Sequence, residues 1–176
     1  MSAGAATFLP VRIAVLTVSD TRDEATDTSG AALVEMLRAD GHELADKRIV
    51  HDDRGTIEAV LAEHIANPEV DCVLTTGGTG VTARDVTPEA VRGVADTEID
   101  GFGELFRWLS YQKVGTSTMQ SRAVGVVARG TYIFALPGSK GACKDAWTGI
   151  LSNQLDARHT PCNLVELMPR LNKPEG

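Results

Sequence analysis

Two patterns of hydrophobic residues alternate along this chain. Some segments are near-continuous apolar runs, typical of strands that are covered on both faces of a sheet. Others place apolar residues three or four positions apart, as Leu33, Met36 and Leu37 are, which is typical of a helix with one buried face. Because strand and helix alternate, the pattern predicts a doubly wound α/β fold with a parallel sheet. We predict strands over 12–18, 42–50 and 70–76, helices over 29–40 and 56–66, a short helix after Pro88, and a further helix around 102–109.

The last third of the pattern predicts a reversed strand. Two apolar runs, 123–128 and 131–136, are separated only by Arg129-Gly130, and so short a separation favours a tight antiparallel hairpin. The run 131–136 leads through 137–139 into another helix, so we take it as the parallel member of the pair. The sheet is therefore predicted to be mixed, with 123–128 running against the rest.

Composition and charge narrow the class of protein. A length of 176 residues, 43% of them hydrophobic and 23% charged, is ordinary for one soluble globular domain. No segment approaches the roughly 20 apolar residues that span a bilayer. Residues 1–12 do not resemble a secretion signal, so we expect a cytoplasmic protein. The net charge of −7 disfavours nucleic acid as a partner and means that an anionic ligand must be held by local groups or a metal ion. The cysteines, Cys72, Cys143 and Cys162, are odd in number and widely spaced, which argues against a disulfide framework and a zinc site.

The segment 71–90, DCVLTTGGTGVTARDVTPEA, is the most informative in the chain. A predicted strand ends at Thr76 and runs into Gly77, Gly78, Thr79 and Gly80, which we call the glycine turn. Glycine permits positive φ and close approach of backbone N–H groups to an anion. Thr87-Pro88 is typical of an N-cap and a first helical position, so a helix N-terminus is expected to face the turn as well. The segment predicts a phosphate site, although a helix-entry loop that binds nothing has the same pattern.

Carboxylates follow two of the predicted strands. Asp52 and Asp53 come after the second strand and Asp85 after the glycine turn. Since the carboxyl ends of parallel strands meet at one edge of a sheet, a carboxylate from each loop is predicted to share one Mg²⁺ with phosphate oxygens. Each aspartate is also a common cap of a turn or helix.

Other candidate site residues at the same edge have both a structural and a functional interpretation. Residues 17–20 and 136–139 end strands there too. Ser139 is a typical N-cap beside N–H donors that attract anions. The basic side chains nearby are either solvated surface charges or phosphate contacts; they are Arg84, Arg122, Lys140 and Lys144.

Several familiar sites are not supported. Gly78–Ala83 matches G-x-G-x-x-A, but Pro88 postpones the helix, and the acidic residues Glu98 and Asp100 lie in helix-rich sequence rather than at a strand end. A nicotinamide-dependent oxidoreductase therefore rests on a weak match. No Gly-Lys-Ser/Thr completes a Walker A loop. The histidines have neither metal-ligand spacing nor a neighbouring nucleophile signature.

The chain closely resembles the MoaB/MogA family of molybdenum cofactor biosynthesis proteins, and its bacterial MoaB branch in particular. The resemblance covers nearly the whole sequence. It rests on RIAVLTVSD at 12–20, DTSG at 27–30, TTGGTGVTARDVTPEA at 75–90, GFGELFR at 101–107, GTSTMQSRAV at 115–124, LPGSKGAC at 136–143 and QLDARHTPCN at 154–163.

This resemblance implies a three-layer α/β/α sandwich in a single domain, 1–176, and a homo-oligomer, either a trimer or a hexamer of two trimers. It implies binding of molybdopterin and, in catalytic members, transfer of AMP from Mg-ATP to the molybdopterin phosphate. The alternative is a non-catalytic molybdopterin-binding or carrier protein. We expect the C-terminal tail, 161–176, to pack on a neighbouring subunit.

The same resemblance assigns roles to particular positions. Asp52 and Asp85 match the family's two carboxylates, and both the catalytic role and the Mg²⁺ ligands are assigned to them. Retention of aspartate at 52 favours an active site. The remaining positions are assigned to substrate and nucleotide; they are Ser19, Thr76, Gly77, Gly78, Thr79, Gly80, Ser121, Pro137, Gly138 and Ser139.

Overall fold

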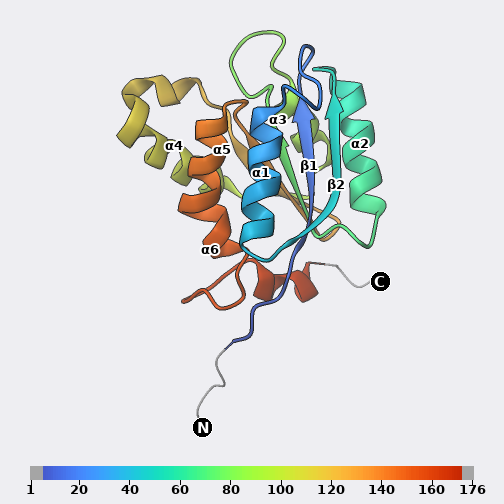
Figure 1. The fold of residues 1–176 in the computed structure, drawn as a ribbon, viewed down its shortest axis with the longest axis vertical. Helices are drawn as coiled ribbons and strands as arrows, with labels where there is room; N and C mark the ends of the chain where they lie inside the picture. The colour runs from blue at the N-terminus through green and yellow to red at the C-terminus, as the bar shows by residue number, and fades with distance from the viewer. Residues whose placement is uncertain (1–5, 172–176) are drawn as a thin grey trace.

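A computed structural model describes residues 6–171. Its centre is a six-stranded sheet with the order β2-β1-β3-β6-β5-β4 (Figure 1). Only β5 runs against its neighbours, since β5 pairs antiparallel with both β6 and β4 while the other pairings are parallel. The strands are β1 (Arg12–Val18), β2 (Glu43–Val50), β3 (Cys72–Thr76), β4 (Thr97–Glu98), β5 (Val124–Ala128) and β6 (Thr131–Leu136).

Helices cover both faces of the sheet, which confirms the three-layer α/β/α sandwich. One face carries α1 (Thr28–Ala39), α4 (Asp100–Val114), α5 (Lys140–Ala146) and the π-helical turn Trp147–Leu151 that continues into α6 (Ser152–Gln154). The other face carries α2 (Arg54–Ala66) and α3 (Thr87–Val94). In Figure 1, α1 and α5 lie in front of the sheet, and α2 lies beside β2. Among residues 6–171, no helix is long and apolar enough to cross a membrane.

The alternation of side chains along β1 explains the two cores. Ile13 and Val15 belong to the core under α1, α4 and α5, whereas Ala14, Leu16 and Val18 belong to the core under α2 and α3. Successive residues of a strand point to opposite faces, so a strand between two helical layers must be apolar at every position. The continuous apolar run that predicted this strand is the direct result.

The hairpin between β5 and β6 confirms the predicted reversal. Its two turn residues both adopt positive φ, 47° at Arg129 and 86° at Gly130, which is the conformation that a two-residue connection needs to match the twist of its strands. The sequence prediction missed β4. Glu98 belongs to this strand rather than to a helix, and two residues are too few to show an alternating pattern.

Part of the C-terminal tail packs on the chain itself. Leu164, Val165, Met168 and Leu171 contact the core under α1 and α5, and Tyr132 donates a hydrogen bond to the Leu164 carbonyl at 2.9 Å. Contact of this tail with a neighbouring subunit stays a prediction, and residues 172–176 lie outside the described part of the chain.

A buried histidine ties the start of β1 to the helical layer. His42 is 5% exposed, its Nδ1 accepts the Val11 N–H at 3.1 Å, and its ring meets Phe8 and Trp147. Burial disfavours the imidazolium and lowers the pKa of His42 below its ordinary value of 6.5, although Asp40 and Asp156 oppose this shift. The ring is therefore held neutral, as an acceptor.

The free energy of unfolding is expected to fall as the pH drops below about 6.5, because the unfolded chain then takes up a proton that folded His42 resists. The variant His42→Asn keeps an acceptor for Val11 and lacks the titration. It should cost about 1–2 kcal/mol at pH 7 through lost packing. Thermal unfolding of both proteins between pH 5 and 7.5 should show this deficit shrinking as the pH falls. A deficit that is constant over this range would contradict the assignment.

Candidate functional site

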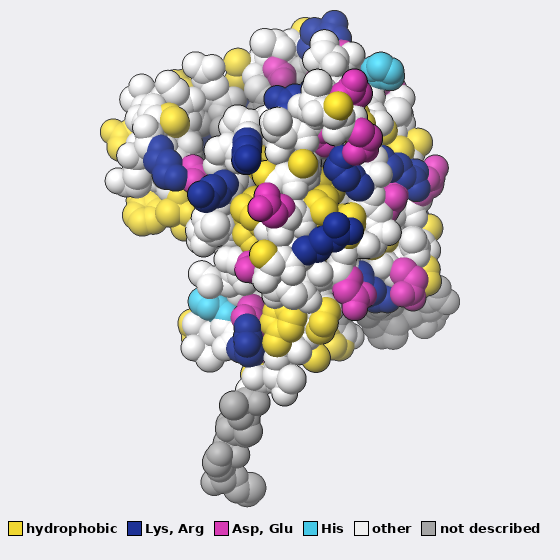
Figure 2. All heavy atoms as spheres, in the orientation of Figure 1, with side chains coloured by type: hydrophobic (Ala, Val, Ile, Leu, Met, Phe, Trp, Pro, Cys, Tyr) yellow, Lys and Arg dark blue, Asp and Glu magenta, His cyan; other side chains and the backbone are white. Residues whose placement is uncertain are grey.

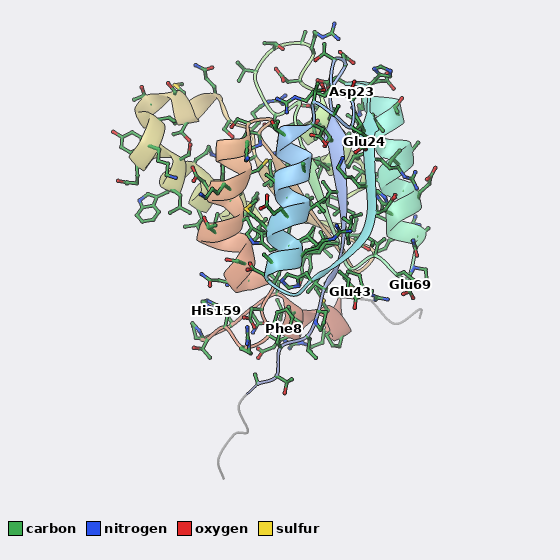
Figure 3. All side chains as sticks on the ribbon, viewed as in Figure 1. Phe8, Asp23, Glu24, Glu43, Glu69 and His159 are labelled. Carbon is green, nitrogen blue, oxygen red and sulfur yellow. The ribbon has the colours of Figure 1, made fainter. Side chains whose placement is uncertain are left out.

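The carboxyl ends of three neighbouring strands are level with one another. The sheet register pairs Thr17 of β1 with Thr76 of β3, and Thr76 with Leu136 of β6. The loop after β3 contacts the end of β6, because Gly77 N–H donates to the Leu136 carbonyl at 3.0 Å. Figure 3 shows Asp23 near this end of the sheet, while Glu43 and Glu69 lie at the opposite end. The strand ends predicted to meet at one edge do so.

The glycine turn is possible only with glycine at its first two positions. Gly77 has φ +105° and Gly78 has φ +66°, in the region that side chains with a Cβ rarely adopt. A Cβ on Gly77 would collide with the Val18 carbonyl oxygen, and one on Gly78 would collide with Thr87 Oγ1 and lie 3.0 Å from Asp52 Oδ1. Within residues 6–171, the N–H groups of Gly78 and Thr79 donate to no backbone carbonyl. The turn therefore packs tightly against Val18, Thr87 and Asp52, while the N–H groups of Gly78 and Thr79 are left as backbone donors.

Asp52 approaches the glycine turn from the loop after β2. Its Oδ1 is buried and has no hydrogen-bond partner within the described part of the chain. Burial raises the pKa of Asp52 and the negative charge of Asp85 raises it further, against a lowering effect of the Val86 N–H. A buried carboxylate oxygen without a donor is costly and is satisfied by a cation or a proton.

Asp85 approaches the same turn from the loop before α3. Its Oδ2 accepts the Thr82 N–H at 2.9 Å and the Thr82 hydroxyl at 2.7 Å, and it would lie 2.8 Å from a Cβ on Gly80. Burial opposes ionisation of Asp85, but the hydrogen bonds from Thr82 outweigh it and lower the pKa. Asp85 thus caps a turn, which is the simpler of its two predicted roles. Like Asp52, it also lies next to the glycine turn. Among residues 6–171 there is no cluster of three or more His, Cys, Asp or Glu side chains suited to a metal ion.

The hydroxyl of Thr87 has a different role from the predicted N-cap. The N-cap position of α3 belongs to Val86, and there is no side-chain cap. Thr87 Oγ1 instead donates to the Gly77 carbonyl at 2.9 Å, and its N–H donates to the Gly78 carbonyl at 3.1 Å. A hydroxyl pointing back into a neighbouring turn cannot also serve its own helix, so Thr87 fixes the glycine turn against the start of α3.

Arg122 organises the far side of the glycine turn. Its guanidinium donates to the carbonyls of Gly80 and Asp85, each at 2.6 Å, and forms an ion pair with Glu89. Its backbone N–H donates to the Thr79 carbonyl at 2.9 Å. This side chain is therefore not the freely solvated charge that was one of its two interpretations, and its contact with phosphate stays a prediction. Because Ser121 is its neighbour in the chain, Arg122 also brings Ser121 to the turn.

The other predicted site residues shape the loops around this centre. Ser139 caps α5 by accepting the Ala142 N–H at 3.1 Å, as expected. Thr76 Oγ1 donates to the Pro137 carbonyl at 2.9 Å, which joins the loops after β3 and β6, and a Cβ on Gly138 would lie 3.3 Å from Gly77 Cα. Ser19 Oγ accepts the N–H groups of Thr21 and Arg22 at 3.2 and 3.1 Å and so orders the loop after β1.

One residue of the predicted strand end 17–20 was given no role by the sequence prediction. Asp20 accepts the Asp52 N–H at 3.0 Å and forms an ion pair with Arg84. The only available signal was its position directly after the first strand, in the same edge as Asp52.

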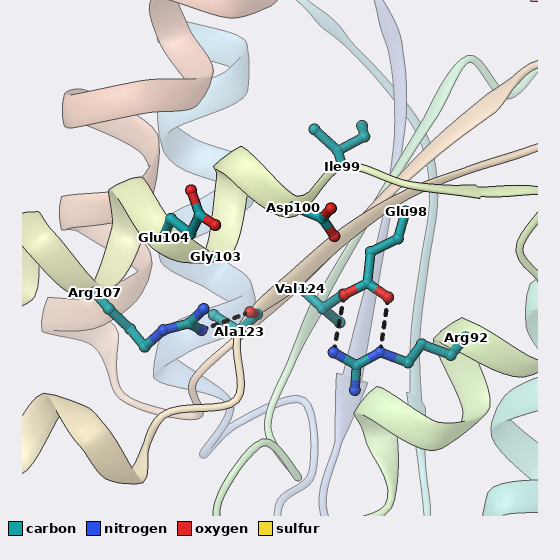
Figure 4. Close-up of a pocket in the computed structure, with 9 residues that line it drawn as sticks. All are labelled: Arg92, Glu98, Ile99, Asp100, Gly103, Glu104, Arg107, Ala123 and Val124. Atoms are coloured by element: carbon teal, nitrogen blue, oxygen red, sulfur yellow. Dashed lines mark hydrogen bonds and ion pairs between the residues drawn. The ribbon is translucent and has the colours of Figure 1, made fainter.

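A separate hollow lies beside β4 and the start of α4 (Figure 4). Its volume is about 150 Å³, and none of the predicted site residues line it. Arg92 donates to both oxygens of Glu98 at 3.0 and 2.9 Å, and Arg107 donates to the Ala123 carbonyl at 3.1 Å. Its basic side chains are thus already engaged by the protein, so the glycine turn remains the better candidate for an anionic ligand.

Comparisons with known proteins identify a sequence family and solved structures with a similar fold. Residues 14–157 match a family described as a probable molybdopterin binding domain. The chain is 51% identical over 163 residues to molybdenum cofactor biosynthesis protein B of Escherichia coli (strain K12), which covers 93% of this chain and 96% of that protein. A crystal structure of a molybdenum cofactor biosynthesis protein B has a TM-score of 0.84 at 41% identity, covering 93% of this chain and 96% of that one. The tungsten cofactor synthesizing protein MoaB from Pyrococcus furiosus has a TM-score of 0.77 at 33% identity, covering 93% and 98%.

Proposed function

Because the chain belongs to the MoaB/MogA family of molybdenum cofactor biosynthesis proteins and carries its molybdopterin-binding domain, we propose that it transfers AMP from Mg-ATP to molybdopterin. The products are adenylyl-molybdopterin and pyrophosphate. The observation that supports this best is the approach of two carboxylates, Asp52 and Asp85, to one glycine turn from separate loops.

The donor set suits a hard divalent cation. Asp52 offers a buried oxygen without a partner, and the lowered pKa of Asp85 keeps its carboxylate ionised at neutral pH. Carboxylate oxygens are the ligands that Mg²⁺ takes together with phosphate oxygens. Asp52 and Asp85 would hold the ion, which when bound supplies positive charge against the polyphosphate.

The rest of the chemistry is alignment. A phosphate oxygen of molybdopterin forms a bond to the α-phosphorus of ATP, and the bond from that phosphorus to the β-phosphate bridging oxygen breaks, so pyrophosphate leaves. The chain supplies no nucleophile, and none is needed. The N–H groups of Gly78 and Thr79 would bind and orient phosphate oxygens as negative charge spreads. Arg122 and Thr87 hold the turn in the shape that presents those donors.

Turnover tests this function directly. The protein incubated with Mg-ATP and molybdopterin should release pyrophosphate, and leaving out Mg²⁺ should abolish the release. A folded protein that gives no pyrophosphate would contradict the transferase. The second candidate, a non-catalytic molybdopterin carrier, is favoured by the fact that hydrogen bonds from Thr82 satisfy Asp85 Oδ2 without a metal ion. It predicts molybdopterin affinity that is the same with and without Mg-ATP.

We also propose that α4 forms a contact between copies of the chain. Its exposed face carries Leu105, Trp108, Tyr111 and Val114, which are 43%, 61%, 54% and 52% exposed. Figure 2 shows hydrophobic side chains gathered at the left of the molecule, where α4 lies. Beside it, a mostly apolar cavity of about 190 Å³ is lined by Leu105, Ile150, Leu164 and their neighbours. An exposed apolar helix face of this kind is typical of a subunit contact, and a second copy is the partner that the family resemblance implies.

Trp108→Glu should lower the mass in solution from that of a trimer or hexamer to that of a monomer, because it places a charge in the centre of an apolar contact. Light scattering after size-exclusion chromatography measures this. The control is Leu9→Glu, since Leu9 is also 53% exposed but lies outside α4. Equal masses for the wild type and Trp108→Glu would exclude α4 from the contact.

A further inference from the structure

Asp20 lies where the loops of three neighbouring strands come together. It follows β1, which stands between β2 and β3 in the sheet. The pairing of β1 with β2 continues past the strands, because Ser19 N–H donates to the Val50 carbonyl at 2.9 Å. The side chain of residue 20 therefore emerges between the loop that carries Asp52 and the loop that carries Asp85.

The carboxylate of Asp20 contacts both of these loops. Oδ1 accepts the backbone N–H of Asp52 at 3.0 Å and lies 3.4 Å from His51 Nδ1. Oδ2 forms an ion pair with the guanidinium of Arg84, the residue before Asp85. Each contacted residue either is a predicted metal ligand, as Asp52 is, or is its neighbour in the chain, as His51 and Arg84 are.

The two kinds of contact differ in strength. The side chain of Arg84 is 75% exposed, and an ion pair in that setting contributes little. The Asp20 side chain is only 30% exposed, and a hydrogen bond from a backbone N–H to a carboxylate is charge-assisted and stronger. The contact with Asp52 is thus the one that restricts the loop. Among residues 6–171, Asp20 forms no three-acid group with Asp52 and Asp85 that suits a metal ion, so it is not placed as a ligand.

We propose that Asp20 is a positioning residue: it holds the Asp52 peptide so that the Asp52 carboxylate faces the glycine turn. This inference rests on the proposed function for its role in turnover. Groups that orient metal ligands commonly change metal affinity or activity by about 10- to 100-fold when they are lost.

Asp20→Ala and Asp20→Asn separate positioning from charge. Asp20→Asn keeps an oxygen that accepts the Asp52 N–H, whereas Asp20→Ala keeps neither oxygen nor charge. Asp20→Ala should lower kcat by about 10- to 100-fold with little change in the KM for molybdopterin, and Asp20→Asn should recover most of the loss. The matched control is Glu24→Ala, which removes another carboxylate that Figure 3 shows near the same end of the sheet and that, among residues 6–171, forms an ion pair only with Lys47. It should leave kcat unchanged.

A second measurement does not depend on turnover. The affinity for Mn²⁺ alone, followed by electron paramagnetic resonance, should be about 10-fold weaker in Asp20→Ala than in the wild type and in Asp20→Asn. If the wild type releases no pyrophosphate, the proposed function fails while the order of Mn²⁺ affinities still supports Asp20. Equal Mn²⁺ affinity in all variants, or none in the wild type, overturns the inference even where turnover is normal. Circular dichroism shows whether Asp20→Ala folds. If it does not, Asp20→Asn decides: a loss of kcat as large as that of Asp52→Asn overturns the positioning role of Asp20.

Discussion

Asp85→Asn is expected to lower pyrophosphate release by about 10²- to 10³-fold while molybdopterin binding is retained. The substitution removes the negative charge that holds the cation but keeps an oxygen that accepts the Thr82 N–H and hydroxyl, so the turn keeps its shape. Turnover with Mg-ATP and pterin affinity, measured on the same protein, separate these effects. Full activity in Asp85→Asn would remove the carboxylate from the mechanism.

Asp52→Asn should lose turnover to a similar extent and yet be more stable than the wild type. The folded state raises the pKa of Asp52 above 3.8, chiefly through burial, so the ionised side chain lowers stability. Because the pKa of Asp52 is higher in the folded state, its protonated form stabilises the fold below pH 3.8. This contribution to the free energy of unfolding is lost as the pH rises through the pKa of the folded state.

Thermal unfolding of Asp52→Asn and the wild type between pH 3.5 and 7 measures the difference. The free energy of unfolding of Asp52→Asn should increase relative to that of the wild type as the pH rises, and the difference should reach about 0.5–1 kcal/mol near neutrality. Acids that do not interact with Asp52 titrate alike in both proteins and cancel in the comparison, whereas Asp85, whose charge acts on Asp52, contributes to the difference. Parallel stability curves would show that the charge of Asp52 is not opposed by the folded state. Loss of activity together with a gain in stability is the pattern expected of a residue kept for function.

Gly77→Ala should lower the free energy of unfolding by about 2–4 kcal/mol or prevent folding. Alanine at φ +105° is strained, and its Cβ would collide with the backbone carbonyl oxygen of Val18, at the end of a strand that is buried at every position after Arg12. The strand cannot shift without disturbing both cores. Denaturant unfolding at neutral pH measures the change.

Gly141→Ala is the matched control for this substitution. Gly141 lies in the first turn of α5, and a Cβ there would meet nothing within 4 Å. Alanine is the better helix former by up to about 1 kcal/mol, so this variant should be as stable as the wild type or slightly more stable. A Gly77→Ala protein of wild-type stability would mean that the glycine turn is not fixed as described.

The sequence predicted well those features that depend on one residue or one segment. The continuous apolar run of β1, the Arg129-Gly130 hairpin and the Ser139 cap were all predicted, since each is decided by local chemistry. The starts of α1 and α2 were placed one and two residues late, because the caps are Asp27 and Asp53, each accepting an N–H three residues on.

The sequence could not predict features that depend on contacts between distant segments. Thr87 has the residue type and the position of an N-cap, yet the nearby Gly77 carbonyl takes its hydroxyl. Arg122 is 42 positions from Gly80, and nothing in its own neighbourhood distinguishes it from a solvated arginine. Both became visible only when the loops were placed in space. The roles assigned to Asp52, Asp85 and the glycine turn remain predictions that turnover will decide.

The contact between Arg122 and the glycine turn also sets an order of events during synthesis. Both carboxylates, Asp20 and every glycine of the turn are made within the first 85 residues, but the guanidinium that fixes Gly80 and Asp85 comes later in the chain. A nascent polypeptide halted before residue 122 would hold all the acids without the cation that arranges them. The site also needs β6 and Pro137, which come later still, so fragments that end before residue 122 should be unable to retain ligand.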